Sequence, residues 1–304
     1  MPIRIRNADI TKIKADAIVN AANSALIMGG GVCGAIFRAA GAERMRAECE
    51  KIGYCPAGGA VHTSAGALFA KYAIHTVGPV WRGGCSGEEA LLRSCYRASL
   101  ALAKELGLSS IAFPLISAGI FGYPKEAAMT VALSEAQNFL LENDMEICFA
   151  LFGDPKEFLN TAVYRSLSVY LDSVSETEIK NAASMTAGGS EAAFCRVLSR
   201  AFTESGRSGE QLSGRANIGH KRLKELFSGE SYPKKEEMLA LSVALFGDVC
   251  RASPLLESAE CRFDGSKKAD LIVRRLLETG CKDICFINLA LFAFGEEQLG
   301  ERLE

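Results

Sequence analysis

Residues 17–34 read AIVNAANSALIMGGGVCG, and this stretch decides the fold of the N-terminal part of the chain. It opens with the short apolar run Ala17-Ile18-Val19, typical of a buried strand, and it ends in the glycine-rich segment Gly29 to Gly34, where a helical pattern begins. A glycine loop between a strand and a helix lets backbone N–H groups approach an anion, and the positive helix end adds attraction. The stretch predicts an anion-binding turn in an α/β fold, with a plain tight turn as the alternative.

Three further apolar runs of strand length follow, separated by helical patterns. The runs cover residues 72–77, 110–113 and 147–152, and the helical patterns cover 34–52, 88–106, 124–142 and 156–171. This alternation is typical of helices packed on both faces of a largely parallel sheet. Such sheets bind ligands outside the carboxyl ends of their strands. We therefore expect one α/β unit over residues 1–172.

A second glycine-containing segment lies at the end of another strand. Residues 116–124 read ISAGIFGYP and follow the run at 110–113, and Pro124 suits the first turn of the next helix. Two such loops at one edge of a sheet can hold a diphosphate from both sides through main-chain donors. The pair predicts a diphosphate site more specifically than either loop alone.

Two other glycine-loop folds fit this pattern less well. A dinucleotide-binding Rossmann domain needs its glycines in the first tight turn and an acidic residue about 20 positions further on. Here the stretch from Asn20 to Met28 precedes the glycines, and Glu48 and Glu50 fall inside a helical pattern. A P-loop is excluded because no Gly-Lys-Ser/Thr sequence ends the loop.

Five segments together resemble the signature set of the macrodomain family, in the order that the family has them. They are residues 8–11 (ADIT), 16–23 (DAIVNAAN), 29–32 (GGGV), 74–79 (IHTVGP) and 116–124. The resemblance covers about the first 155 residues. It implies a three-layer α/β/α fold with a largely parallel mixed sheet, and a site for ADP-ribose, free or attached to a protein.

The resemblance also implies roles for individual residues. Asp9 corresponds to a carboxylate that accepts a hydrogen bond from the adenine amino group, with the backbone of Ile10 alongside. Asn23 corresponds to a contact with the distal ribose, Phe121 to an aromatic against that ribose, and Phe152 to a neighbour of the adenine. The loops that wrap the diphosphate comprise Gly30, Gly31, Val32, Ser117, Ala118, Gly119, Ile120 and Phe121.

Structural roles compete with these assignments. An alternative for Asp9 is a cap on a helix or turn, and an alternative for Phe152 is a place in the core. We interpret Asn20 as a structural residue that fixes the loop through backbone hydrogen bonds. His75, inside an apolar run, is interpreted as a core histidine with satisfied hydrogen bonds, and His62 as an ordinary strand or loop residue.

The chain departs from the hydrolytic members of that family at two positions. Their glycine loop reads Gly-Gly-Gly-Val-Asp-Gly with a histidine four residues after the Asp, and this chain has Cys33 and Phe37 there. The usual acidic group is therefore absent. Three hypotheses follow: a water positioned by Asn23 and Phe121 and activated by the substrate's own diphosphate, a chemical role for Cys33 near a helix N-terminus, or an ADP-ribose reader without turnover.

Because Asn23 and Phe121 are intact, we favour an ADP-ribosyl hydrolase or O-acetyl-ADP-ribose deacetylase. Its candidate catalytic residues are Asn23, Cys33 and Phe121.

The composition changes after residue 172. Residues 173–190 are small and polar and predict a linker, and residues 191–304 predict an all-α helical domain. The helical patterns cover 193–205, a segment that a capping box opens at 208–211, then 220–227, 234–246 and two amphipathic stretches within 270–299.

The order of these helices resembles the helix-turn-helix domains of phage-repressor-like regulators. The resemblance implies that the third helix enters the DNA major groove with His220, Lys221, Arg222 and Lys224. Residues 190–304 hold 17 Lys and Arg against 18 Asp and Glu, so no basic surplus supports DNA binding. We favour a protein-interaction or regulatory role, and an ADP-ribose-responsive DNA-binding regulator is a third hypothesis for the chain.

Composition limits the remaining classes. Of the 304 residues, 49% are hydrophobic and 23% are charged, and the net charge of -2 favours neither nucleic acid nor an anionic membrane surface. Eleven cysteines without a CxxC pair and three scattered histidines predict neither a disulfide framework nor a metal site. The N-terminus has no signal-peptide pattern and no long apolar run follows, so we expect a cytoplasmic protein without a cofactor or membrane contact.

Overall fold

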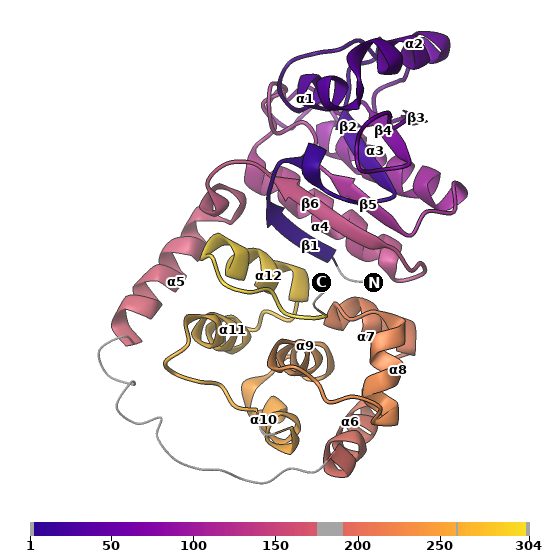
Figure 1. The fold of residues 1–304 in the computed structure, drawn as a ribbon. Helices are drawn as coiled ribbons and strands as arrows, with labels where there is room; N and C mark the ends of the chain where they lie inside the picture. The colour runs from indigo at the N-terminus through magenta and orange to yellow at the C-terminus, as the bar shows by residue number, and fades with distance from the viewer. Residues whose placement is uncertain (1–2, 175–190, 260, 302–304) are drawn as a thin grey trace. The chain divides into compact units, whose positions relative to one another are not determined.

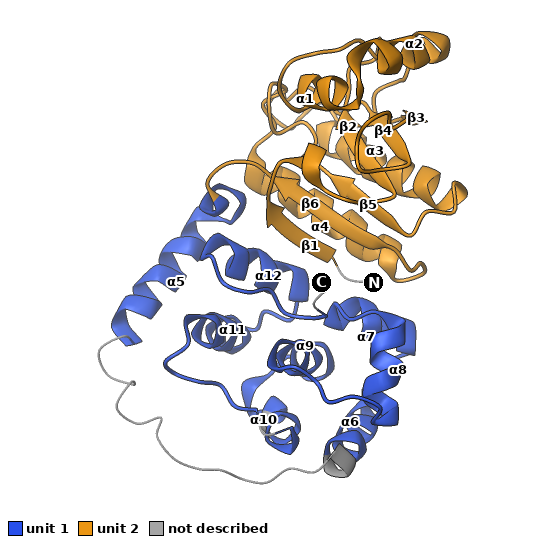
Figure 2. Ribbon diagram, in the orientation of Figure 1, with its two compact units in different colours: residues 1–2, 155–304 blue, residues 3–154 orange. Residues whose placement is uncertain are grey.

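The computed structural model describes residues 3–174, 191–259 and 261–301, which divide into two compact units (Figures 1 and 2). The α/β unit comprises residues 3–154, and the helical unit comprises the described residues from Pro155 onward. Each unit has its own core and is described by itself.

One sheet of six strands forms the centre of the α/β unit, in the order β1-β6-β5-β2-β4-β3. Every neighbouring pair is parallel except β3 with β4, which confirms the largely parallel mixed sheet expected from the sequence. The strands are β1 Ile3–Asn7, β2 Ala17–Ala21, β3 Ala60–Ser64, β4 Tyr72–Thr76, β5 Ser110–Phe113 and β6 Glu146–Leu151.

Four α-helices cover the two faces of this sheet (Figure 1): α1 Gly31–Ala40, α2 Ala42–Ile52, α3 Glu88–Glu105 and α4 Lys125–Leu140. Two short 3₁₀ helices, η1 Ile10–Lys12 and η2 Pro155–Phe158, follow β1 and β6. The single helix expected over residues 34–52 is wrong, because Gly41 has a φ of +95° and separates α1 from α2.

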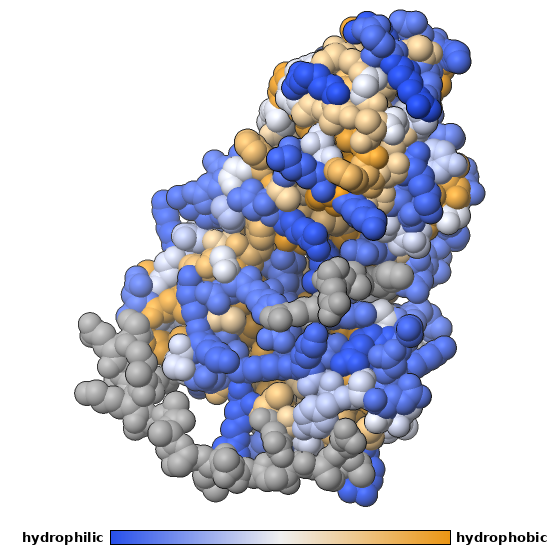
Figure 3. All heavy atoms as spheres, in the orientation of Figure 1, coloured by the Kyte–Doolittle hydropathy of each residue, from blue (hydrophilic) through white to orange (hydrophobic). Residues whose placement is uncertain are grey.

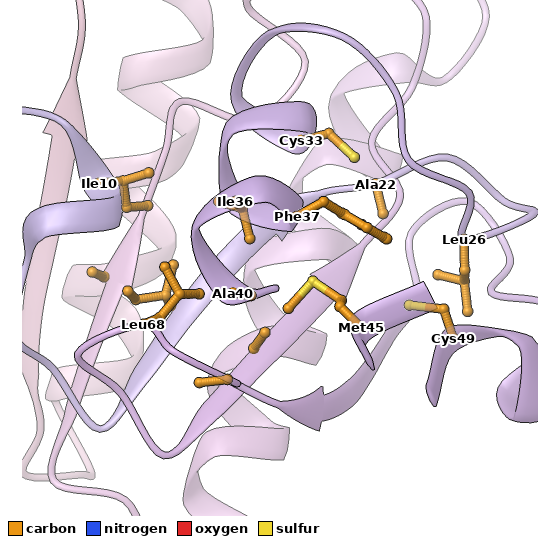
Figure 4. Packing of buried hydrophobic residues seen from close by; sticks show 14 of the residues in the cluster. Ile10, Ala22, Leu26, Cys33, Ile36, Phe37, Ala40, Met45, Cys49 and Leu68 are labelled. Atoms are coloured by element: carbon orange, nitrogen blue, oxygen red, sulfur yellow. The ribbon is translucent and has the colours of Figure 1, made fainter. Parts of the chain in front are cut away.

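The core of the α/β unit lies on both sides of the sheet. On one side Ile36 and Phe37 of α1 and Met45 and Cys49 of α2 pack over the strands, as the close-up in Figure 4 shows. On the other side Tyr96 of α3 packs against Phe113 and Phe149, with ring centroids 5.3 and 6.3 Å away. Alternate strand residues point to opposite faces, so both layers of helices rest on one set of strands.

The described residues of the helical unit form helices and no strand, as the sequence predicted for residues 191–304. The helices are α5 Thr161–Val174, α6 Glu191–Ser205, α7 Gly209–Ala216, α8 His220–Ser228, α9 Lys235–Leu245, α10 Val249–Ser258, α11 Lys268–Glu278 and α12 Ile284–Ala293. The capping box at the start of α7 is confirmed, because Ser208 Oγ accepts from Gln211 N and Gln211 Oε1 accepts from Ser208 N.

Helix α5 packs within the helical unit, although the sequence placed it with the sheet. The ring of Tyr164 stacks on Phe294 with centroids 4.6 Å apart, and the Arg275 guanidinium lies 5.2 Å from the ring of Tyr170. These two aromatic side chains therefore join α5 to the end of α12 and to α11.

None of the helices in the described part of the chain is long and apolar enough to cross a membrane. Figure 3 shows hydrophilic residues over much of the visible face of both units, with hydrophobic residues between them.

Candidate functional site

Two neighbouring parallel strands, β2 and β5, carry glycine loops at their carboxyl ends. We call residues 28–34 the first glycine loop and residues 116–124 the second glycine loop. The chain leaves β2 towards β4 on one side and later returns to β5 on the other, and such a switch point is where open α/β sheets bind ligands.

A cavity of about 300 Å³ lies between the two loops, and we call it the glycine-loop cavity. It brings together most of the predicted site residues. Its lining includes Asn23, Gly30, Gly31, Val32, Cys33, Ser117, Gly119, Ile120 and Phe121, whereas Ala118, Asp9, Ile10 and Phe152 are not part of it.

Two glycines allow the loops to approach each other and their neighbours. A Cβ atom on Gly34 would lie 2.6 Å from the carbonyl oxygen of Gly29, and one on Gly78 would lie 2.1 Å from Ser117 Oγ. Both distances are far below van der Waals contact. The second glycine loop therefore rests directly on the backbone that leaves β4.

Ser117 carries the strongest local sign of a bound ligand. Its φ of +64° is in the left-handed region, which costs a residue with a side chain about 1–2 kcal/mol. The residue is only 5% exposed, and Oγ has no hydrogen-bond partner within the described chain. A buried hydroxyl without a partner costs a further 1–3 kcal/mol or so. Because Ser117 lines the glycine-loop cavity, a ligand there can satisfy this hydroxyl.

Asn23 and Phe121 both line the cavity. The amide of Asn23 is fixed by Ile27, because Nδ2 donates to the Ile27 carbonyl at 2.7 Å and Oδ1 accepts from its N–H at 3.2 Å. One N–H and one lone pair of the amide remain for a ligand. The carbonyl of Phe121 accepts from the N–H of Trp81 at 2.8 Å, and the Trp81 ring packs on Tyr123.

The predicted adenine residues lie together at the ends of β1 and β6. These strands are parallel with Asn7 opposite Leu151, and the N–H of Ala8 donates to the Leu151 carbonyl at 3.1 Å. Phe152 follows directly and is 85% exposed, so the alternative of a core position is wrong. Three strand spacings, or roughly 14 Å, separate β1 from β2 along the sheet edge. The edge therefore suits an elongated ligand.

Asp9 caps η1, which confirms the structural alternative without removing the functional one. Its Oδ1 accepts from the Thr11 hydroxyl at 2.7 Å and from the Thr11 N–H at 3.0 Å, and these bonds hold the pKa of Asp9 below its usual value. Oδ2 receives no hydrogen bond from the described residues. The hydrogen bonds from Thr11 to Oδ1 therefore fix the orientation of this exposed carboxylate, and Oδ2 can accept a hydrogen bond from a ligand.

Cys33 lies in the first turn of α1 (Figure 4), and its thiol contacts a chain of buried polar side chains. Its Sγ is 3.6 Å from Asn20 Nδ2, which also lies 3.0 Å from His75 Nδ1, and His75 Nε2 is 2.9 Å from Thr63 Oγ1. The expectation that Asn20 bonds to backbone is wrong, since its partners are side chains. His75 is confirmed as a buried core histidine, and His62 as an ordinary residue of β3.

Burial lowers the pKa of His75 to about 4, against about 6.5 for an unfolded histidine. Between these values the unfolded chain binds a proton that the folded chain does not, so stability is lost as the pH falls. We expect the free energy of unfolding to fall by about 2 kcal/mol from pH 7 to pH 5. Carboxylates whose pKa is lowered in the folded chain change the free energy of unfolding mainly below about pH 4.5, so they contribute little to this difference.

Urea unfolding of His75→Gln at the two pH values checks this expectation, because the variant should lose most of the difference. His62→Gln removes an exposed imidazole from β3 and should keep it. Equal pH dependence in His75→Gln and the wild type would contradict the assignment.

A second cavity, of about 460 Å³, adjoins the first, and we call it the side cavity. Both cavities are lined by Asn23, Gly78 and Phe121. Much of the side cavity's wall is apolar, although Ser24, Arg82 and Ser86 also line it, and both oxygens of its one acidic group, Glu88, already accept hydrogen bonds. The Glu88 carboxylate accepts N–H bonds from Ser86 at 2.6 Å, Arg82 at 3.0 Å and Gly84 at 3.2 Å; hydrogen bonds from its own backbone and from these groups lower its pKa.

Sequence reasoning missed Gly78, Trp81 and the side cavity. Gly78-Pro79 directly after a buried run was the available signal, but the need for glycine comes from Ser117, which is distant in sequence. Within the described residues, no group of three His, Cys, Asp or Glu side chains is placed to hold a metal ion.

The predicted DNA-contacting residues lie on α8 of the helical unit. Lys221 and Lys224 are exposed and His220 is half-buried. Arg222 differs, because its guanidinium donates to Glu237 at 2.7 and 2.8 Å and also to Ser231 and the Tyr232 carbonyl. This side chain joins α8 to α9 and is not free for phosphate, so DNA contact stays a prediction for the other three.

Comparisons with known proteins find similar sequences over about half of the chain. The family model for the Macro domain matches residues 19–132. A Macro domain-containing protein of Methanosarcina mazei is 53% identical over 143 residues, which are 47% of this chain and 76% of that protein. The O-acetyl-ADP-ribose deacetylase of Escherichia fergusonii is 45% identical over 171 residues, which are 54% of this chain and 94% of that protein.

One of the solved structures to which this chain is similar is also a macrodomain. The Oceanobacillus iheyensis macrodomain with ADP is 40% identical, covers 56% of this chain and 90% of its own, and has a TM-score of 0.48.

Proposed function

This chain belongs to the macrodomain family, and on that premise we propose that its α/β unit binds ADP-ribose, free or protein-linked, and hydrolyses an ester on the distal ribose. The observation that carries the proposal is Ser117. Its backbone is left-handed and its buried hydroxyl has no hydrogen-bond partner, and both features cost free energy of folding. A ligand oxygen in the cavity between the two glycine loops would accept a hydrogen bond from this hydroxyl and offset that cost.

The proposed ligand lies along the carboxyl edge of the sheet. Its adenine contacts the free oxygen of Asp9 and the ring of Phe152, and its diphosphate lies between the two glycine loops. The N-terminus of α1 favours that negative charge. Its distal ribose lies at Asn23 and Phe121, where both cavities meet.

The proposed reaction is ester hydrolysis, the activity in the name of the Escherichia fergusonii relative. Among the residues that line the two cavities, Glu88 is the one carboxylate, and its oxygens already accept backbone hydrogen bonds. Cys33 has a thiol where the hydrolytic family members have a carboxylate, so no free carboxylate remains to act as the base. We assign the water's proton to an oxygen of the substrate's own diphosphate, with Asn23 and Phe121 orienting the water.

A reader without turnover is the second candidate, and Phe37 favours it. Phe37 occupies the position at which the hydrolytic macrodomains described above have a histidine. Its side chain is 1% exposed, and its ring centroid lies 6.2 Å from that of His75. Cys33 is likewise 5% exposed. Two positions associated with catalysis thus serve packing.

Release of ADP-ribose from O-acetyl-ADP-ribose and from an ADP-ribosylated protein tests the proposal. We expect turnover by the wild type and a fall in kcat of roughly tenfold in Asn23→Ala, since the water loses its orientation. Cys33→Ala should stay within about threefold of the wild type, a packing-scale effect. Loss of turnover in Cys33→Ala with binding intact would assign the chemistry to Cys33, and binding without any release would make the protein a reader.

A further inference from the structure

We propose that the side cavity receives the acyl group of the ester, and that the preferred substrate carries an apolar acyl chain longer than acetyl on its distal ribose. This inference rests on the proposed function, which leaves the acyl group unspecified.

Continuity between the two cavities is the first argument. Asn23, Gly78 and Phe121 line both, and they are the residues at which the proposed function places the distal ribose. A substituent on that ribose that points away from the diphosphate therefore enters the side cavity. The ester bond then lies next to Asn23 and Phe121, as the reaction requires.

Size is the second argument. The side cavity has a volume of about 460 Å³, whereas a cavity of roughly 150 Å³ already holds a benzene molecule. An acetyl group is smaller than benzene and would leave most of the space to water. A chain of four to six carbons fills it better.

The chemistry of the wall is the third argument. Val77, Val80 and Leu91 present hydrocarbon, and Ala57, which forms an isolated parallel bridge with Val77, adds a methyl group. The polar residues of the wall are Ser24, Arg82, Ser86 and Glu88. Glu88 has both oxygens engaged by backbone N–H groups, so it offers no partner for a cationic side chain. Val80 is 52% exposed, and an apolar chain would cover it.

The reaction balances as hydrolysis with no further reactant. The water oxygen bonds to the acyl carbon, the bond from that carbon to the ribose oxygen breaks, and the ribose oxygen takes up a proton. The products are ADP-ribose and a carboxylate with one proton released.

A chain-length series tests the inference with the full chain. We expect kcat/KM to rise by about fourfold per methylene, so roughly fifteenfold from the acetyl to the butyryl ester of ADP-ribose, with the hexanoyl ester at least as good as butyryl. Ala57→Leu narrows the side cavity and should reduce the butyryl-to-acetyl ratio by roughly tenfold. The matched control is Ala101→Leu, at an exposed position of α3 outside both cavities, which should keep the wild-type ratio.

The outcomes separate the inference from the proposed function. Cleavage of acetyl with a flat or falling series, or an unchanged ratio in Ala57→Leu, overturns the inference and leaves the proposed function standing. If the chain binds ADP-ribose without cleaving esters, the dissociation constants of the three esters serve instead, and equal values overturn the inference. Absence of binding to ADP-ribose and to every ester overturns both.

Discussion

Gly78→Ala is expected to lower the affinity for ADP-ribose by roughly a hundredfold, about 3 kcal/mol. The new methyl group would lie 2.1 Å from Ser117 Oγ and 2.7 Å from Ile116 Cγ2, so the second glycine loop must move. That movement displaces the donors proposed to hold the diphosphate. Overpacking should also reduce the free energy of unfolding by about 1–3 kcal/mol. Calorimetric titration with ADP-ribose, beside urea unfolding, measures both effects.

The matched control is Gly209→Ala at the start of α7. A Cβ atom there meets nothing within 4 Å, so the same substitution should leave ADP-ribose binding unchanged. Wild-type affinity in a folded Gly78→Ala protein would show that the ligand does not use the second glycine loop.

Asp9→Asn is expected to lower ADP-ribose affinity by roughly thirtyfold, about 2 kcal/mol, with little change in stability. Asparagine caps helices as well as aspartate does, so the bonds to the Thr11 hydroxyl and N–H are retained. The free carboxylate oxygen, a hydrogen-bond acceptor, is replaced by the amide NH2, a donor. Two donors then face each other, the amide and the adenine amino group, so the hydrogen bond is lost. The substitution thus separates the cap from the proposed contact with the ligand.

The hypoxanthine analogue of ADP-ribose, which has an acceptor in place of the adenine amino group, provides the control. The wild type should prefer ADP-ribose over this analogue, and Asp9→Asn should reduce or reverse the preference. An equal loss of affinity for both ligands would show that Asp9 acts on the fold of the η1 segment and does not read the base.

The sequence predicted the sheet where strands are continuous apolar runs. The strands β2, β4, β5 and β6 are buried on both faces and were found within one or two residues. The outer strands were missed: in β1, Ile3 and Ile5 alternate with arginines, and β3 is mostly half-buried or exposed. Helix α10 was missed as well, because Pro254 interrupts its pattern, although Asp248 supplies a cap.

The glycine-loop cavity could be predicted because its residues lie in two short segments. Parallel strands bring their carboxyl ends to one edge, so loops after neighbouring strands meet. Contacts between those loops and the residues after β4 cannot be predicted from the order of the segments along the chain. Gly78 and the side cavity were missed for this reason. The expected bonding of Asn20 was wrong for the same reason, since His75 comes from the adjacent strand.

Binding of ADP-ribose in the glycine-loop cavity is best tested by a titration of the full chain followed by tryptophan fluorescence. Trp81 is the one tryptophan of the sequence. Its backbone N–H donates to the Phe121 carbonyl at 2.8 Å and its ring packs on Tyr123, so its emission reports on the second glycine loop. We predict a saturable, one-to-one change in emission with ADP-ribose that Gly78→Ala weakens. No change in emission, together with no heat in calorimetry, would show that this cavity does not bind ADP-ribose.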